Sequence, residues 1–152
     1  MTETRQTEIE QVLQNRASFS HFVSENIRFS DTDLVGHVNN TSFAVYCEAG
    51  RVHFGMSLKL PADSSFGGVL ARIEINMRAE AHFPGVIEIG TGVVRVGRTS
   101  YTLGQGLFMG DKCVATAQGV LVAIDARTRR PTPLTEATRT ALLERLLPGL
   151  QA

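Results

Sequence analysis

The chain has 152 residues, about the length of one domain, and 43% of them are hydrophobic, so it can bury a core. Its 15 basic and 15 acidic side chains cancel without forming a block of one sign, which argues against a nucleic-acid-binding or membrane-binding surface. The longest apolar run near the C-terminus, residues 120–124, is far shorter than the roughly 20 residues that span a bilayer. We therefore expect a small molecule as the partner, with neither nucleic acid nor membrane.

The N-terminal segment predicts a helix and gives no sign of export. Its first ten residues are polar and acidic, and they lack the positive start and apolar stretch of a signal peptide. Apolar side chains at helical spacing then predict a helix over Glu3–Gln14. The two cysteines, Cys47 and Cys113, are isolated thiols of the kind found in the cores of cytosolic proteins. We therefore expect a cytoplasmic protein.

A short strand and a long helix are predicted next, on either side of a polar turn. Ile27 and Phe29 alternate with polar residues, which predicts a half-buried strand over Val23–Ser30. Over Thr41–Ser57 apolar residues recur at spacings of three and four, the pattern of a helix with one buried face. The polar residues 39–41 are candidate caps for this helix.

Four longer strands and a last helix complete the chain. Glycines inside these strands predict bulges or bends and hence a curved sheet, and small residues on one face of the last strand leave room for a close helix. Thr135 is a candidate cap for a helix that holds the leucines of residues 142–147. On periodicity alone the chain is α+β. The predicted strands are Val69–Ala81, Val86–Val96, Tyr101–Met109 and Lys112–Asp125.

The turn before the long helix holds the residues best suited to chemistry. From Asp31 to Asn40 it reads DTDLVGHVNN, in which two carboxylates precede a helix start. The first turn of a helix presents unpaired N–H groups and partial positive charge, so a carbonyl oxygen held there is polarised while a nearby acid attacks it or activates water. The structural alternative is that such a carboxylate makes an Asx-turn or a cap.

The same stretch resembles the signature of the hotdog-fold acyl-CoA thioesterases, the 4-hydroxybenzoyl-CoA thioesterase-like family, which has the form D-x-D-x-x-G-x-V followed by a central helix. The resemblance continues through residues 71–75, 81–84, 96–101 and 119–122. It implies an α+β hotdog fold, in which a curved antiparallel sheet wraps around one central helix. The two outer helices predicted above are then accessory helices at the N- and C-terminal ends. We expect a single such domain over residues 1–152.

By this resemblance Asp33 is the catalytic acid and Asp31 supports it. The family's oxyanion donor is a backbone N–H at the start of the central helix, which falls at Asn40. His37 is a secondary candidate that could orient the site or move protons. Gly36 is a substrate-binding candidate, because a glycine there permits a positive φ or close approach of the substrate.

Plant acyl-carrier-protein thioesterases resemble the same stretch, with an Asp and a His that match Asp33 and His37. The Asn that they have between these two residues is replaced here by Val35, which favours Asp33 acting without an amide partner. A related hotdog branch uses a helix Glu as its acid, which makes Glu48 the second candidate. Glu48 and Arg51 are three residues apart, so an intrahelical ion pair is the structural interpretation of both.

Coenzyme A carries phosphates that need cations or backbone donors to bind them. Arg98 and Ser100 lie in a turn that resembles a CoA-contacting hairpin of the family, so they are further substrate-binding candidates; a solvated loop charge is the alternative for Arg98. The four histidines are at least sixteen residues apart and no pair of closely spaced cysteines accompanies them. We therefore expect neither a metal site nor a cofactor.

Together these features predict an acyl-CoA thioesterase that hydrolyses a fatty or aromatic acyl-CoA, with Asp33 as nucleophile or general base and Asn40 N–H as oxyanion donor. Hotdog subunits typically build each active site across a dimer interface, so the resemblance implies a homodimer, and a homotetramer is common in the family. Two alternatives are a hotdog enoyl-CoA hydratase or dehydratase, whose relatives space Asp and His one residue wider than here, and a noncatalytic acyl-CoA-binding module.

Overall fold

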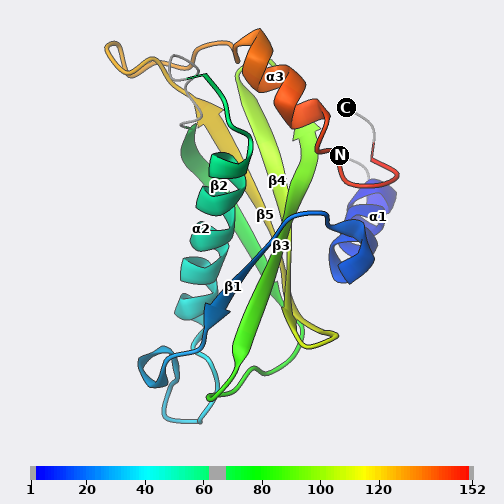
Figure 1. Cartoon of the computed structure of the whole chain (residues 1–152), viewed down its shortest axis with the longest axis vertical. Coiled ribbons are helices and arrows are strands. Elements are labelled where there is room, and N and C mark those ends of the chain that lie inside the picture. The colour runs from blue at the N-terminus through cyan, green and yellow to red at the C-terminus, as the bar shows by residue number, and fades with distance from the viewer. Residues whose placement is uncertain (1–2, 62–67, 151–152) are drawn as a thin grey trace.

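In a computed structural model, the described residues 3–61 and 68–150 form one five-stranded sheet and three α-helices (Figure 1). Two 3-10 helices, Arg16–Ser18 and Phe29–Asp31, precede and follow the first strand. The helices are α1 (Glu3–Gln14), α2 (Asn40–Ser57) and α3 (Glu136–Leu143), and the strands are β1 (Phe22–Asn26), β2 (Gly68–Met77), β3 (Val86–Val96), β4 (Ser100–Met109) and β5 (Lys112–Ala123).

The sheet is antiparallel throughout, in the order β1-β3-β4-β5-β2. The chain passes from β1 through α2 to β2 at the opposite edge, and β3, β4 and β5 then fill the centre as consecutive hairpins. Figure 1 shows α2 running along the twisted sheet, with its first turn at the lower end of the molecule. A curved antiparallel sheet around one helix is the hotdog architecture, and this confirms the predicted fold class.

The core between α2 and the sheet depends on small residues in β5. Phe43, Tyr46 and Cys47 of α2 are buried against a face that includes Ala115 and Ala117. Because methyl side chains leave space above the strand, the aromatic rings of the helix can pack closely there. The small-residue face of β5 that the sequence predicts is therefore turned toward the rings of α2.

The opposite face of the sheet is covered by α1 and the segment after it. Ile9 and Leu13 are fully buried in this second layer. Gly90 of β3 and Gly106 of β4 pair with each other, and a Cβ on Gly90 would lie 2.5 Å from the ring of Phe19. These glycines therefore allow close approach of the N-terminal segment.

Glycines do not mark the bulges, which corrects one prediction. The register shifts instead lie at Leu70/Arg72, Val93/Arg95 and Leu107/Phe108. Because none of these residues is a glycine, the irregularities do not depend on the backbone freedom of that residue type.

Three strands end earlier than predicted, among them β5, which stops at Ala123 instead of Asp125. The first stops at Asn26 instead of Ser30, because the chain turns into a 3-10 helix in which the Phe29 side chain is 77% exposed. Strand β2 stops at Met77 instead of Ala81, because the next two backbone N–H groups both donate to the carbonyl of Val114 and turn the chain away from the ladder.

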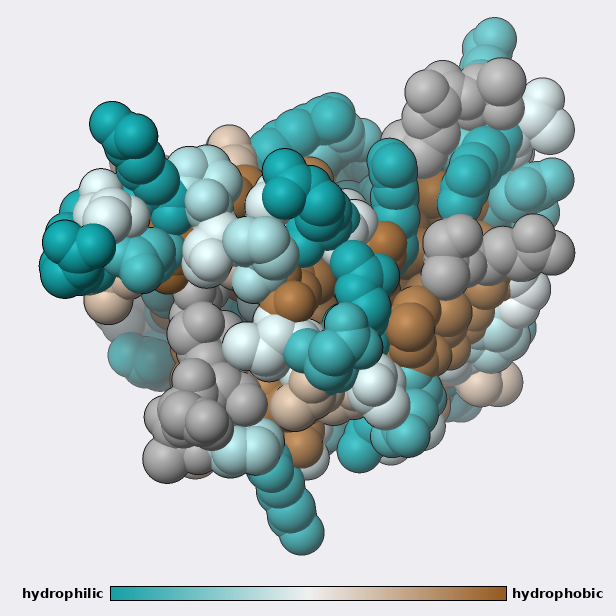
Figure 2. Space-filling model, turned by 90° about the horizontal axis from the view of Figure 1, so that it is seen from above, coloured by the Kyte–Doolittle hydropathy of each residue, from teal (hydrophilic) through white to brown (hydrophobic). Residues whose placement is uncertain are grey.

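Helix α3 begins as predicted, with the Thr135 side chain accepting a hydrogen bond from the Thr138 N–H. It ends at Leu143, so residues 146–147 follow the helix instead of belonging to it, and Leu147 still packs against the α1 layer. Seen from above, hydrophilic side chains project on several sides and hydrophobic residues show between them (Figure 2). Among the described residues, no helix combines the length and apolar character needed to cross a bilayer.

Candidate active site

The turn between β1 and α2 is held by its own backbone. Thr32 and Val38 form an isolated antiparallel bridge, and the Asp33 N–H donates to the carbonyl of His37 at 2.9 Å. The Gly36 N–H donates back to the carbonyl of Asp33 at 3.0 Å, with Gly36 at a φ of +87°. Because L side chains avoid this conformation, glycine is the residue that closes the turn.

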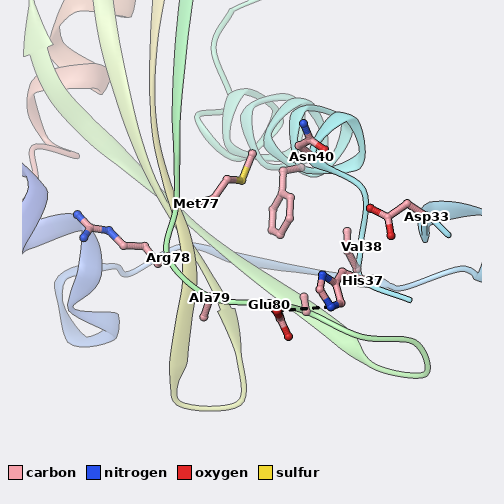
Figure 3. Close-up of a pocket in the computed structure, with 10 residues that line it drawn as sticks. Asp33, His37, Val38, Asn40, Met77, Arg78, Ala79 and Glu80 are labelled. Atoms are coloured by element: carbon pink, nitrogen blue, oxygen red, sulfur yellow. Dashed lines mark ion pairs between the residues drawn. The ribbon is translucent and has the colours of Figure 1, made fainter. Parts of the chain in front are cut away.

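Asp33 combines a turn role with access to a cavity. Its Oδ1 accepts the Val35 N–H at 2.9 Å, which is the Asx-turn of the structural alternative. The side chain is only half-buried, and it also lines a cavity of about 390 Å³ together with His37 and Asn40. Figure 3 shows one carboxylate oxygen directed toward the start of α2. Turn and cavity roles are compatible, because a carboxylate has two oxygens and the Val35 N–H engages Oδ1 alone.

The start of α2 is capped in a way that leaves one amide available. Asn39 is the N-cap, and its side chain accepts the Thr41 N–H at 2.9 Å. Asn40 is the first helical residue, and its N–H donates to no acceptor within residues 3–61 and 68–150. A first-turn N–H beside a cavity is an electrostatically favourable donor for a carbonyl oxygen or oxyanion.

Asp31 supports the turn instead of facing the cavity. Its Oδ2 accepts hydrogen bonds from the Arg28 N–H and the Tyr46 hydroxyl, both at 2.8 Å. Its carbonyl accepts the Asn39 N–H at 2.7 Å and the Ser42 hydroxyl at 3.0 Å. Burial raises the pKa of Tyr46, and its hydrogen bond to Asp31 raises it further. Asp31 therefore ties the turn to α2.

The other wall of the cavity is the segment that leaves β2. Residues 77–81 line it, and the Val38 N–H donates to the carbonyl of Ala81 at 2.8 Å, which joins the two walls. Phe43 contributes an aromatic surface from α2. The sequence patterns do not place this segment at the site, although residues 81–84 belong to the stretches that carry the family resemblance.

Two histidines that are distant in sequence meet beside this wall. The rings of His37 and His82 have centroids 5.1 Å apart and are nearly perpendicular. Glu80 lies between them, with 3.4 Å from His37 Nε2 to one carboxylate oxygen and 3.4 Å from His82 Nε2 to the other. The ion pair of His37 and Glu80 is drawn in Figure 3. Sequence spacing alone did not predict this cluster.

The predicted CoA-binding residues and the second candidate acid lie away from the cavity of Asp33. Arg98 and Ser100 are in the β3–β4 hairpin, next to α3 and at the opposite end of the sheet from Asp33 (Figure 1). Glu48 is exposed on α2 and does not line the cavity of Asp33.

The prediction of an ion pair between Glu48 and Arg51 is wrong, because no such pair forms among the residues that the structure describes. Arg51 is only 8% exposed, and its guanidinium donates to the Gln105 side chain at 3.5 Å instead. Burial lowers the pKa of Arg51.

A family model now places this geometry among known proteins. The model of the thioesterase-like superfamily matches residues 27–142, which include the turn, α2 and all the strands that follow. The chain belongs to the thioesterase-like superfamily. The turn and helix start described above lie inside the matched region of this thioesterase-like protein.

Solved structures resemble this thioesterase-like chain over most of its length. A predicted thioesterase from Bacillus stearothermophilus is 30% identical, with a TM-score of 0.76 over 84% of this chain and 98% of that one. A thioesterase from Thermus thermophilus, in complex with coenzyme A and Zn, is 29% identical, with a TM-score of 0.75 over 84% and 94%. The uncharacterized protein YsmA of Bacillus subtilis is 35% identical over 49 residues; the match spans 32% of this chain and about a third of YsmA.

Proposed function

We propose that this protein is an acyl-CoA thioesterase that hydrolyses a fatty or aromatic acyl-CoA to the free acid and coenzyme A. The observation that carries the proposal is that the Asp33 carboxylate and the Asn40 helix start line one cavity. Membership of the thioesterase-like superfamily supports the reaction, and the CoA complex of the Thermus relative supports the substrate class. We also propose a cytoplasmic location, which the two isolated thiols of Cys47 and Cys113 support.

In the proposed reaction the thioester carbonyl oxygen accepts the Asn40 N–H, and the partial positive charge of the helix start stabilises the developing oxyanion. Asp33 then acts in one of two ways. As a nucleophile it attacks the carbonyl carbon and expels the CoA thiolate, and water hydrolyses the resulting mixed anhydride. As a general base it takes a proton from a water that attacks instead. His37 orients this water or relays its proton, and Gly36 lets the substrate approach the backbone.

The proposed enzyme is a homodimer, and exposed apolar residues on β2 support this. Strand β2 is an edge of the sheet in one subunit. Leu70, Ile73 and Met77 lie along it, and their exposed fractions are 38%, 36% and 49%. An exposed apolar edge strand is a template for pairing with another chain. A second copy added along β2 would cover these side chains; two such dimers would make a homotetramer.

The dimer also gives a role to residues far from Asp33. If two β2 strands pair antiparallel about a two-fold axis, each sheet places its α3 end beside the other subunit's Asp33 end. We therefore assign the phosphates of CoA to Arg98 and Ser100 of the partner subunit. An Arg98→Ala variant is then expected to raise KM for acyl-CoA while changing kcat little, because phosphate binding is the same in the ground and transition states.

The test of the proposed function uses the purified protein with short, long and aromatic saturated acyl-CoAs and with an enoyl-CoA. Free thiol and loss of the enoyl absorbance are followed in the same samples. We expect catalytic thiol release from at least one saturated acyl-CoA. Loss of the double bond without thiol release would instead support the hydratase, and tight acyl-CoA binding without either reaction would support the binding module.

A further inference from the structure

The cluster of His37, Glu80 and His82 joins the two walls of the cavity. All three side chains are of types that can bind a metal ion. One ligand atom from each residue can be chosen so that all three lie within 4.8 Å of one another. His37 comes from the turn before α2, whereas Glu80 and His82 come from the segment that leaves β2. Two imidazole nitrogens and a carboxylate are a common set of three protein ligands for Zn²⁺.

The spacing of the cluster suits an ion better than it suits direct hydrogen bonds. Both nitrogen–oxygen separations to Glu80 are 3.4 Å, beyond the roughly 2.7–3.2 Å of a good N–H···O bond. Zn²⁺ bonds to nitrogen and oxygen of about 2.0–2.2 Å in a tetrahedron place neighbouring ligand atoms about 3.3–3.6 Å apart. Each of the two separations, which involve different oxygens of Glu80, therefore matches the length of one edge of such a site.

A further hydrogen bond prepares one histidine for an ion. His82 Nδ1 lies 3.2 Å from the carbonyl oxygen of Gly36. Because a carbonyl can only accept, Nδ1 is the atom that carries the proton in this contact. In the neutral ring Nε2 then keeps its lone pair, and Nε2 is the atom that faces Glu80. A backbone carbonyl that fixes the tautomer in this way is a usual second partner of a metal-binding histidine.

The cluster is also open to solvent, which an exchangeable ion requires. The side chains of His37, Glu80 and His82 are 32%, 61% and 52% exposed. Two surface ion pairs are the alternative interpretation, but exposed pairs contribute little stability and give no reason for two histidines to converge on one carboxylate.

We propose that His37, Glu80 and His82 form a binding site for one divalent transition-metal ion, with Zn²⁺ as the expected occupant. The ion would cross-link the turn before α2 to the segment after β2. His37 and Glu80 also line the cavity that holds Asp33, so occupancy would add positive charge and rigidity to the candidate active site. Three protein ligands leave a fourth position for water or a substrate group.

The test measures metal binding directly, so its result does not depend on the proposed thioesterase activity. Purified protein is treated with a chelator, dialysed and titrated with ZnCl₂ by calorimetry, and Co²⁺ is added to a second sample to record its visible absorption. The variants are His82→Ala and Glu80→Gln, which change exposed side chains. His53→Ala is the matched control, because His53 is an exposed histidine on α2 outside the cluster.

We expect one Zn²⁺ to bind per chain and the melting temperature to rise when Zn²⁺ is added. The visible absorption of bound Co²⁺ should be that of a four-coordinate ion. His82→Ala and Glu80→Gln should each weaken Zn²⁺ binding by at least about 10-fold, and His53→Ala should bind as the wild type does. Binding of equal strength in wild type, His82→Ala and Glu80→Gln would overturn the proposal, as would equal loss in His53→Ala. Circular dichroism of each variant separates lost binding from lost folding, and the wild-type titration decides by itself if a variant does not fold.

Discussion

Gly50 is a position at which α2 lies very close to the sheet, and it offers a test of how the helix is held. A Cβ on Gly50 would lie 2.5 Å from Gln105 Nε2 and 2.6 Å from a methyl group of Ile89. The Gln105 amide is fully buried, and it donates to the Cys47 carbonyl at 3.0 Å and to the Thr91 hydroxyl at 3.1 Å. Gly50→Ala therefore has to displace either the helix or this network.

The magnitude follows from two opposing effects. Alanine is a better helix former than glycine by about 1 kcal/mol, which would stabilise the variant. Overpacking a core costs about 1–3 kcal/mol, and weakening a buried hydrogen bond costs about 1–3 kcal/mol more. Taken together, these effects should lower the free energy of unfolding of Gly50→Ala by about 1–5 kcal/mol.

The assay is urea unfolding at fixed protein concentration, read as a shift of midpoint at constant m-value. Ala44→Gly is the control, because Ala44 is exposed on the same helix and reports propensity alone, a loss of about 1 kcal/mol. A Gly50→Ala variant as stable as the wild type, or more stable, would refute the close approach of α2 to the sheet.

Three other outcomes are expected from buried or half-buried groups. Tyr46→Phe removes the hydroxyl that donates to Asp31, so its urea midpoint should fall by the equivalent of about 1 kcal/mol; an unchanged midpoint would show that this bond contributes nothing. Burial raises the pKa of the Cys47 thiol to about 12, so a thiol reagent at about pH 8 should label Cys47 only in urea, as peptide mapping would reveal. Burial, followed by the charge of Arg145, lowers the pKa of His21 from 6.5, so the unfolded chain binds a proton first and stability should fall as pH drops below about 6.5. His21→Gln should flatten that decline, and an equally steep decline would assign it to other groups.

The spacing of apolar residues was sufficient to predict the bounds of an element where one of its faces is buried. The bounds of α1 and of β3 agree with the predicted Glu3–Gln14 and Val86–Val96. The end of β1 was not predictable in this way, because the Phe29 ring packs across the turn against Phe83, with centroids 5.9 Å apart, instead of continuing the alternation. Arg51 similarly turns toward Gln105 in the sheet, a contact that helical spacing cannot reveal.

The same difference between local and long-range contacts applies to the candidate site. Asp33 and Asn40 are seven residues apart, so the strand–turn–helix pattern placed a carboxylate before a helix start, and the family resemblance singled out these two residues. Glu80 and His82 reach the site through the antiparallel register and the hydrogen bond from Val38 to Ala81, both of which are long-range. Spacing along the chain therefore could not reveal that two histidines 45 residues apart meet side by side.

Asp33 is the residue on which the proposed hydrolysis depends most, and Asp33→Asn tests it directly. The amide oxygen can still accept the Val35 N–H, so the turn should fold, while the carboxylate needed for attack or proton removal is lost. We expect kcat for thiol release to fall by about 10²–10⁴, with Glu48→Gln, the exposed acid on α2, at the wild-type rate. A wild-type rate for Asp33→Asn, or a comparable loss in Glu48→Gln alone, would contradict the assignment of Asp33 as the catalytic acid.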